Sequence, residues 1–212
     1  MSAFRIGFAA LALALTACSK PAAPEAEAVF KPVPIAPYLE DAVLGDPAAP
    51  VTIIEYASTT CGHCYAFHMD VLPGLKEKYI DTGKAKLVYR VLPTPPGPVA
   101  AAGAAIARCA GKDKFFPVIQ ELFEEQEDIL NSVDTPEKLQ KNLTDLGARF
   151  GLSPDEVRTC IQDKSVEDYL VKVVNEAPDF VTATPTLIVD GAHIEDHSLE
   201  SLSAAIDAKL PK

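Results

Sequence analysis

Residues 51–64 have the sequence VTIIEYASTTCGHC, and this stretch decides the fold. Residues 51–56 are rich in β-branched side chains, which is typical of a strand buried on both faces. Residues 61–81 have the pattern of a helix. We expect a break at Pro73, because proline lacks the N–H group and crowds the preceding turn. A strand that runs through a short polar turn into a helix places Cys61 where that helix begins.

The order of the other elements predicts a sheet in two parts. Residues 86–92 form a second strand, and the β-α-β order implies parallel strands with a right-handed crossover. Much later, residues 185–194 form a hairpin around Asp190-Gly191. Residues 198–210 then form a last helix.

The residues between these two parts have only helical signals, including the capping box Ser153-Pro154-Asp155-Glu156. We therefore predict an α/β fold interrupted by an all-helical insertion. Its first half spans residues 41–96, the insertion spans 97–178 and the second half spans 179–212.

The amino terminus resembles an export signal. Arg5 is followed by an apolar run from Ile6 to Ala17, which is shorter than the about 20 residues that a membrane-spanning helix needs and is typical of a signal peptide. Leu15-Thr16-Ala17-Cys18 is similar to the lipobox of bacterial lipoproteins, in which the cysteine is acylated after cleavage. We expect a signal peptide at residues 1–17, a lipid anchor on Cys18, and a proline- and alanine-rich tether at 18–40. The alternative is a plain signal peptide that is cut elsewhere, such as after Ala28.

The composition excludes several classes of protein. The 212 residues are 48% hydrophobic and 23% charged, which excludes a disordered or collagen-like chain. The formal net charge is −11. Because nucleic-acid affinity depends on clustered lysine and arginine side chains, nucleic acid is excluded as the first candidate partner.

Four cysteines remain if Cys18 is lipidated: Cys61, Cys64, Cys109 and Cys160. Exported proteins keep disulfides, and four cysteines allow three ways of pairing. The two-residue gap between Cys61 and Cys64 brings these sulfurs within bonding reach, which leaves Cys109 and Cys160. A structural disulfide between them would close a loop of about 50 residues and stabilise the fold by up to about 4 kcal/mol. The alternative is two free buried thiols.

The pair in Cys61-Gly62-His63-Cys64 can be a metal half-site, a structural bridge or a redox dithiol. A zinc site normally needs four ligands, and the sequence has no second CxxC pair. A bridge across two residues constrains the unfolded chain little. Exchange chemistry fits best, because the free N–H groups and the dipole at a helix start lower the pKa of an attacking Cys61. His63 would add positive charge or a hydrogen bond, and Cys64 would resolve mixed disulfides.

Residues 55–64, EYASTTCGHC, followed much later by Ala183-Thr184-Pro185-Thr186, resemble the DsbA-type branch of the thioredoxin superfamily. The resemblance covers residues 41–210, including the helical insertion, and implies a thioredoxin-like fold. It implies that Cys61 attacks and Cys64 resolves. The departure is Gly62-His63, which resembles disulfide isomerases, whereas bacterial oxidases more often carry Pro-His.

The resemblance also implies roles for three other residues. Pro185 would be held cis beside the disulfide, with Thr184 offering backbone hydrogen bonds to client peptides. Glu55 would be a buried acid that shuttles a proton to Cys64. The alternatives are a trans proline that starts a strand and an idle, exposed Glu55.

Together these features predict a thiol:disulfide oxidoreductase that introduces disulfides into exported proteins. The resemblance implies no cofactor, reduced exported polypeptides as substrates, and a quinone-linked membrane partner resembling DsbB as the reoxidant. We expect a monomer at the periplasmic face of a membrane. Two alternatives stay open: a disulfide isomerase or reductase, and a thioredoxin-fold metal carrier that uses the thiols and His63.

We expect structural roles for three other histidines and for the phenylalanines and acids of the helical insertion. We expect surface or hairpin positions for His68, His193 and His197, helical core positions for Phe115, Phe116 and Phe123, and a solvated helix face for Glu121, Glu124, Glu125, Glu127 and Asp128.

Overall fold

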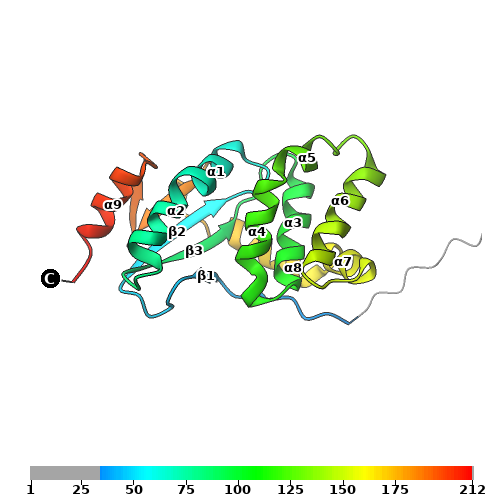
Figure 1. Cartoon of the computed structure of the whole chain (residues 1–212), viewed down its shortest axis with the longest axis horizontal. Helices are drawn as coiled ribbons and strands as arrows, with labels where there is room; N and C mark the ends of the chain where they lie inside the picture. Colours follow the sequence, from blue (N-terminus) through cyan, green and yellow to red (C-terminus); the bar gives the residue numbers. More distant parts are fainter. Residues whose placement is uncertain (1–33, 212) are drawn as a thin grey trace, which may run out of the picture. The chain divides into compact units, whose positions relative to one another are not determined.

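The computed structural model describes residues 34–211, which contain a five-stranded sheet of order β1-β3-β2-β4-β5 (Figure 1). At its centre, β2 (Val51–Ala57) is parallel to β3 (Ala85–Val91) and antiparallel to β4 (Thr186–Val189). β5 (Ala192–Ile194) completes the hairpin with β4. Asp190 and Gly191 have φ angles of 42° and 84°, as expected for a tight hairpin turn. The predicted α/β fold with a divided sheet is confirmed.

β1 (Ala42–Leu44) is an edge strand that the sequence does not predict, and it pairs antiparallel with β3. The chain before it is fixed by Arg108: the Tyr38 N–H donates to the Arg108 carbonyl at 2.9 Å, and Arg108 Nη1 donates to the Tyr38 carbonyl at 2.6 Å. The described end of the predicted tether therefore lies against the folded body. The predicted signal peptide and Cys18 lie outside the described residues.

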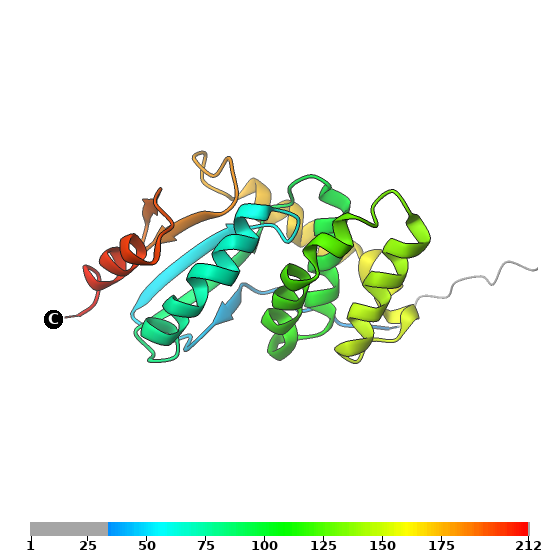
Figure 2. The same ribbon diagram turned by 45° about the horizontal axis from the view of Figure 1, so that its top comes forward.

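One long helix follows β2 and covers one face of the sheet (Figure 2). It consists of α1 (Gly62–Ala66), η1 (Phe67–Val71), α2 (Leu72–Leu75) and η2 (Lys76–Ile80), where η1 and η2 are π-helical turns. We call it the CxxC helix. The break expected at Pro73 does not occur. Pro73 instead lies in the first turn of α2, and the wider η1 turn before it accommodates the missing N–H group.

The two faces of the sheet are covered by different elements. Leu72 and Leu75 of the CxxC helix pack against Ile53, as does α9 (Leu199–Asp207) through Leu202. The opposite face carries Tyr56, which packs against α8 (Lys164–Asn175). Because side chains alternate along a strand, Ile53 and Glu55 point toward the CxxC helix.

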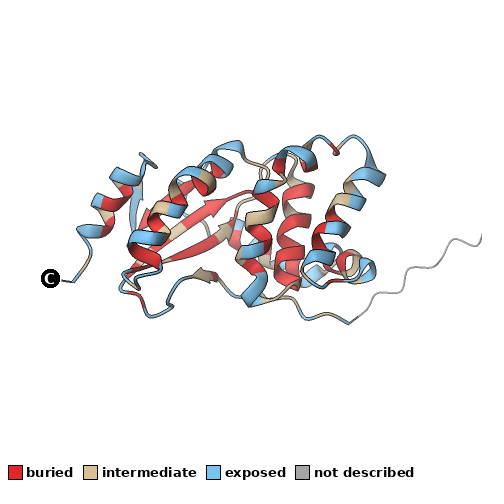
Figure 3. Ribbon diagram, viewed as in Figure 1, coloured by how far each residue is buried: buried red, intermediate tan, exposed pale blue. Residues whose placement is uncertain are grey.

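The helical insertion lies between β3 and β4. Its helices are α3 (Gly97–Cys109), the short turn η3 (Lys112–Lys114), α4 (Phe115–Glu124), α5 (Gln126–Leu130), α6 (Pro136–Arg149), α7 (Pro154–Ile161) and α8. The alanine-rich α3 is buried at the centre (Figure 3). Small residues let its neighbours approach: a Cβ on Gly103 would lie 3.1 Å from Leu122. Phe115 and Phe123 are fully buried and Phe116 is half-buried.

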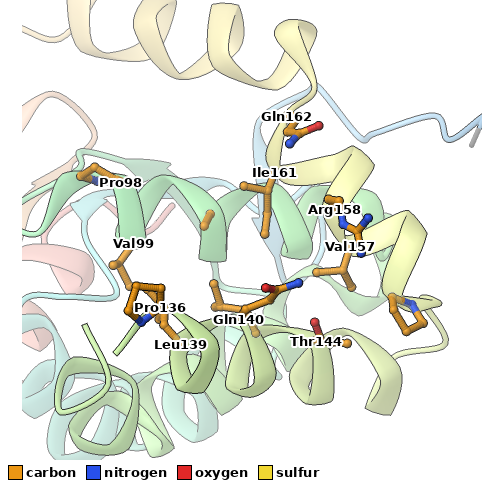
Figure 4. Close-up of a pocket in the computed structure, with 13 residues that line it drawn as sticks. Pro98, Val99, Pro136, Leu139, Gln140, Thr144, Val157, Arg158, Ile161 and Gln162 are labelled. Atoms are coloured by element: carbon orange, nitrogen blue, oxygen red, sulfur yellow. The ribbon is translucent and has the colours of Figure 1, made fainter. Parts of the chain in front are cut away.

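A disulfide between Cys109 and Cys160 joins α3 to α7 across 51 residues. α7 begins at a capping box, in which the Glu156 N–H donates to Ser153 Oγ at 3.3 Å and the Ser153 N–H donates to Glu156 Oε2 at 2.7 Å. The helices α3, α6 and α7 surround a mainly apolar cavity of about 500 Å³ (Figure 4). None of the helices within residues 34–211 is long and apolar enough to span a membrane.

Candidate active site

Cys61 and Cys64 lie where β2 leads into α1. Cys61 is the N-cap residue of α1, with φ −93° and ψ 121°, and its side chain is half-buried. Cys64 is fully buried. Both thiols are free, so the structure shows the dithiol form. The unpaired N–H groups and the dipole at the helix start favour negative charge on Cys61.

The Thr184-Pro185 peptide bond is cis, and this loop contacts the CxxC motif. The Cys61 thiol donates a hydrogen bond to the Thr184 carbonyl oxygen at 3.3 Å. The Thr184 hydroxyl is buried and has no hydrogen-bond partner among the described residues. It is therefore available to donate to a thiolate when Cys61 ionises.

The pKa values of the two thiols are shifted in opposite directions. Burial raises the pKa of Cys61, but hydrogen bonds from Thr184 and from the backbone of Cys64 and His63 outweigh burial and lower it. The pKa of Cys64 lies far above its ordinary value, mainly because of burial and further because of the negative charge of Glu55. Cys61 is thus the thiol that ionises, and Cys64 keeps its proton.

Glu55 is completely buried on β2 and faces the CxxC helix. The sequence predicts His68 at the surface, and this prediction is wrong. His68 is 3% exposed, and its Nε2 lies 3.1 Å from both carboxylate oxygens of Glu55. The reason is helical spacing: His68 follows Cys64 by four residues and therefore faces the sheet with it. That spacing is the signal that could have identified His68.

A groove of about 470 Å³ lies beside the cis-proline loop, and it is lined by His63, His197, Thr184 and Pro185 among others. Gly62 and His63 are exposed, and a Cβ on Gly62 would meet nothing within 4 Å. His193 is exposed on β5, whereas His197 is half-buried at the groove. The groove provides access from solvent to the loop that contacts Cys61.

Gln126 is a site residue that sequence reasoning missed. Its Nε2 donates to the carbonyl oxygens of Thr59 at 2.8 Å and Cys61 at 3.1 Å. Gln126 belongs to α5, so the helical insertion holds the backbone on both sides of Thr60. Thr60 Oγ1 in turn donates to the Thr94 carbonyl at 2.9 Å. The sequence carries no signal for Gln126, because the contact exists only once the insertion has packed against β2.

Within residues 34–211, no group of three or more His, Cys, Asp or Glu side chains is placed to hold a metal ion. The thiols, the buried acid and the cis-proline loop are what the site brings together.

Comparison with known proteins identifies the family. The thioredoxin family model matches residues 39–208. Alpha-DsbA1 of Wolbachia pipientis has a solved structure that is 30% identical, with a TM-score of 0.68, covering 80% of this chain and 90% of that one. The chain belongs to the thioredoxin family, in its DsbA branch. The oxidised BdbD of Bacillus subtilis shares the DsbA-like fold, with a TM-score of 0.70 at 23% identity, over 82% of this chain and 95% of that chain.

A curated relative of this DsbA-like chain is a putative protein-disulfide oxidoreductase of Rickettsia bellii. It is 34% identical over 173 residues, which are 80% of this chain and 64% of that protein. The chain thus spans less than two thirds of the length of this relative. The resemblance to DsbA proteins and the thioredoxin-like fold with a helical insertion, both predicted from the sequence, are confirmed.

Proposed function

We propose that this protein is a thiol:disulfide oxidoreductase that introduces disulfides into other proteins through Cys61 and Cys64. The observation that carries the proposal is the placement of the two thiols at the helix start: Cys61 is half-buried and hydrogen-bonded to the cis-proline loop, whereas Cys64 is fully buried behind it. The pKa of Cys61 is lowered and that of Cys64 is raised, in accord with this placement. A half-buried, acidic thiol can attack and leave, whereas a buried, protonated one reacts only within the molecule.

The reaction begins with the Cys61–Cys64 disulfide. A substrate thiolate attacks Cys61 Sγ, the bond to Cys64 breaks, and Cys64 takes the electron pair and a proton. The second thiolate of the same substrate then attacks the substrate sulfur that is bonded to Cys61. The mixed disulfide breaks, and Cys61 leaves as a thiolate. Two electrons pass from the substrate dithiol to the enzyme, and the substrate leaves with a new disulfide.

The groove beside Pro185 suits an extended polypeptide. Its floor is the cis-proline loop, whose backbone lies within hydrogen-bond distance of Cys61. A loop that pairs with a peptide through backbone groups binds it without reading its sequence. We therefore propose reduced or unfolded polypeptides as substrates, with a DsbB-like quinone-linked membrane protein as the reoxidant and no cofactor in this chain.

The experiment is oxidation of a reduced dithiol peptide by the purified disulfide form. Cys61→Ser should abolish turnover. Cys64→Ser cannot form the disulfide and should not oxidise the peptide either. Given a peptide that already carries a disulfide, its Cys61 thiolate should attack and accumulate a mixed disulfide, because the resolving thiol is missing. Full activity of Cys61→Ser would refute the proposal.

A disulfide isomerase is the second candidate, and Gly62-His63 favours it, since this pair is similar to that of isomerases. Reactivation of a protein with scrambled disulfides, compared with oxidation of the same protein in reduced form, separates the two. Faster reactivation of the scrambled form would favour the isomerase.

We also propose that the protein is exported and anchored to the periplasmic face of a membrane as a monomer. The lipobox-like Leu15-Thr16-Ala17-Cys18 supports this. Metabolic labelling with a radioactive fatty acid tests it, with Cys18→Ala as the control. Label in the wild type that is absent from Cys18→Ala is expected, and an unlabelled wild type contradicts the anchor.

A further inference from the structure

Glu55 and His68 form a buried pair behind the resolving thiol. His68 Nε2 lies 3.1 Å from each carboxylate oxygen of Glu55, and both side chains are buried. Burial is the main cause of the raised pKa values of Cys64 and Tyr89, and the charge of Glu55 adds to both. Glu55 thus interacts with the thiol that must gain and lose a proton in each cycle.

His68 also borders a cavity. This cavity, of about 440 Å³, lies between the CxxC helix and α4, and we call it the α4 cavity. Its wall includes Leu72 and Phe116, and the exposed Pro73 and Pro117 lie at its rim. Because a water molecule occupies about 30 Å³, the cavity has room for several waters or a small solute. The α4 cavity and the groove beside Pro185 share no lining residue.

In the proposed reaction, Cys64 must take up a proton although its side chain is not exposed to solvent. When the disulfide is opened at Cys61, the departing Cys64 thiolate takes up one proton, and reoxidation releases it again. Cys64 and Glu55 are both 0% exposed. A proton from solvent therefore needs a relay to Glu55, and His68 is hydrogen-bonded to its carboxylate.

We propose that His68 exchanges the proton of Glu55 with solvent through the α4 cavity. This inference rests on the proposed function. One ring nitrogen faces the carboxylate, and an imidazole can accept a proton on one nitrogen while it releases one from the other. His68 acts on Cys64 only through Glu55, so it is a positioning residue for proton transfer and does not itself touch the reacting sulfurs.

The ionisable groups around this pair come from several elements. Cys61 and Cys64 flank Glu55 from the start of the CxxC helix, Tyr89 lies beside it on β3, and Lys76 lies at the cavity. Burial lowers the pKa of His197, and the charge of Glu55 opposes this from a distance. On α4, the ring centroid of Phe123 lies 4.2 Å from that of His68. The α4 residues that line the cavity carry no charge.

The test is oxidation of a reduced dithiol peptide by the disulfide form of His68→Ala, followed by rapid acid quenching. We expect the release of Cys64 to slow by about a hundredfold, the lower end of the range for a lost proton-transfer group. Added imidazole should restore the rate, because it fits the enlarged α4 cavity. Pyrazole has the same shape but does not accept a proton at neutral pH, so it should restore nothing.

His68→Gln separates proton transfer from packing, because glutamine keeps a hydrogen-bond donor and similar bulk. We expect this variant to be slow and to have a flatter pH profile than the wild type. Imidazole should not rescue the double variant Glu55→Gln, His68→Ala, since no carboxylate is left to pass the proton on. His193→Gln, at an exposed position, is the matched control and should keep the wild-type rate.

Two outcomes overturn the inference: a wild-type rate and pH profile in His68→Gln, or a slow His68→Ala that imidazole leaves slow. A wild-type protein that does not oxidise the peptide at all is a failure of the proposed function, which distinguishes the two.

Discussion

The Cys61 thiol donates a hydrogen bond to the carbonyl oxygen of Thr184, 3.3 Å away and 123 residues further along the chain. The contact joins the start of α1 to the cis-proline loop across the whole helical insertion. The carbonyl of Thr184 accepts a hydrogen bond from the protonated thiol. Its hydroxyl, which has no partner among the described residues, can donate one to the thiolate. One residue thus serves both protonation states of Cys61.

Thr184→Val should raise the pKa of Cys61, because it removes the hydroxyl and keeps the carbonyl. The measurement is the pH dependence of Cys61 alkylation in the dithiol form. Thr182→Val, at an exposed position of the same loop, is the control and should leave this pKa unchanged. An unchanged pKa in Thr184→Val would show that the hydroxyl does not stabilise the thiolate.

The stability of the dithiol form should pass through a maximum near pH 9, the ordinary pKa of both thiols. The pKa of Cys61 is lowered by folding, so between its folded value and pH 9 the unfolded chain binds more protons and stability rises with pH. The pKa of Cys64 is raised, so above pH 9 the folded protein holds more protons and stability falls. Urea unfolding at a series of pH values measures both limbs.

Each limb has its own control. Cys61→Ser should remove the rise below pH 9, and Cys64→Ser should remove the fall above it. If both limbs persist in both variants, other groups cause them.

Gln126→Leu should lower the free energy of unfolding by about 1 to 3 kcal/mol, because two backbone carbonyl groups, one buried and one partly buried, lose their side-chain donor. Denaturant unfolding measures the change. Gln140→Leu makes the same substitution at an exposed position of α6 and should be close to neutral. A loss in Gln126→Leu no larger than in this control would mean that Gln126 does not hold the loop.

Replacing both Cys109 and Cys160 with alanine should destabilise the protein by about 2 to 4 kcal/mol, because the disulfide closes a loop of 51 residues in the unfolded chain. Thermal unfolding of the variant, compared with the unreduced wild type, measures this. Equal melting temperatures would contradict a stabilising role.

Local patterns were enough to predict the elements that carry their own signals. The β-branched strand that ends before Cys61, the capping box at Ser153 and the turn at Asp190-Gly191 are all encoded by neighbouring residues, and all are present. The three-residue strand β1 is too short for a periodic pattern and exists only because β3 pairs with it.

The site residues also divide into those that the sequence reveals and those that depend on tertiary packing. Cys61, Cys64 and the family motif around Pro185 are visible in the sequence, whereas Gln126 depends on tertiary packing. His68 lies between these cases. Its spacing of four residues from Cys64 puts it on the same face of the helix. A histidine carries no apolar signal that would mark a buried face, so the sequence analysis places His68 at the surface.

The most direct test of the account is the reduction potential of the Cys61–Cys64 couple, measured by equilibration with a glutathione buffer. A stabilised Cys61 thiolate favours the dithiol form and makes the disulfide oxidising. We predict a potential above about −200 mV, in the range of disulfide isomerases and oxidases. A potential at or below that value, toward the about −270 mV of thioredoxin, would contradict it.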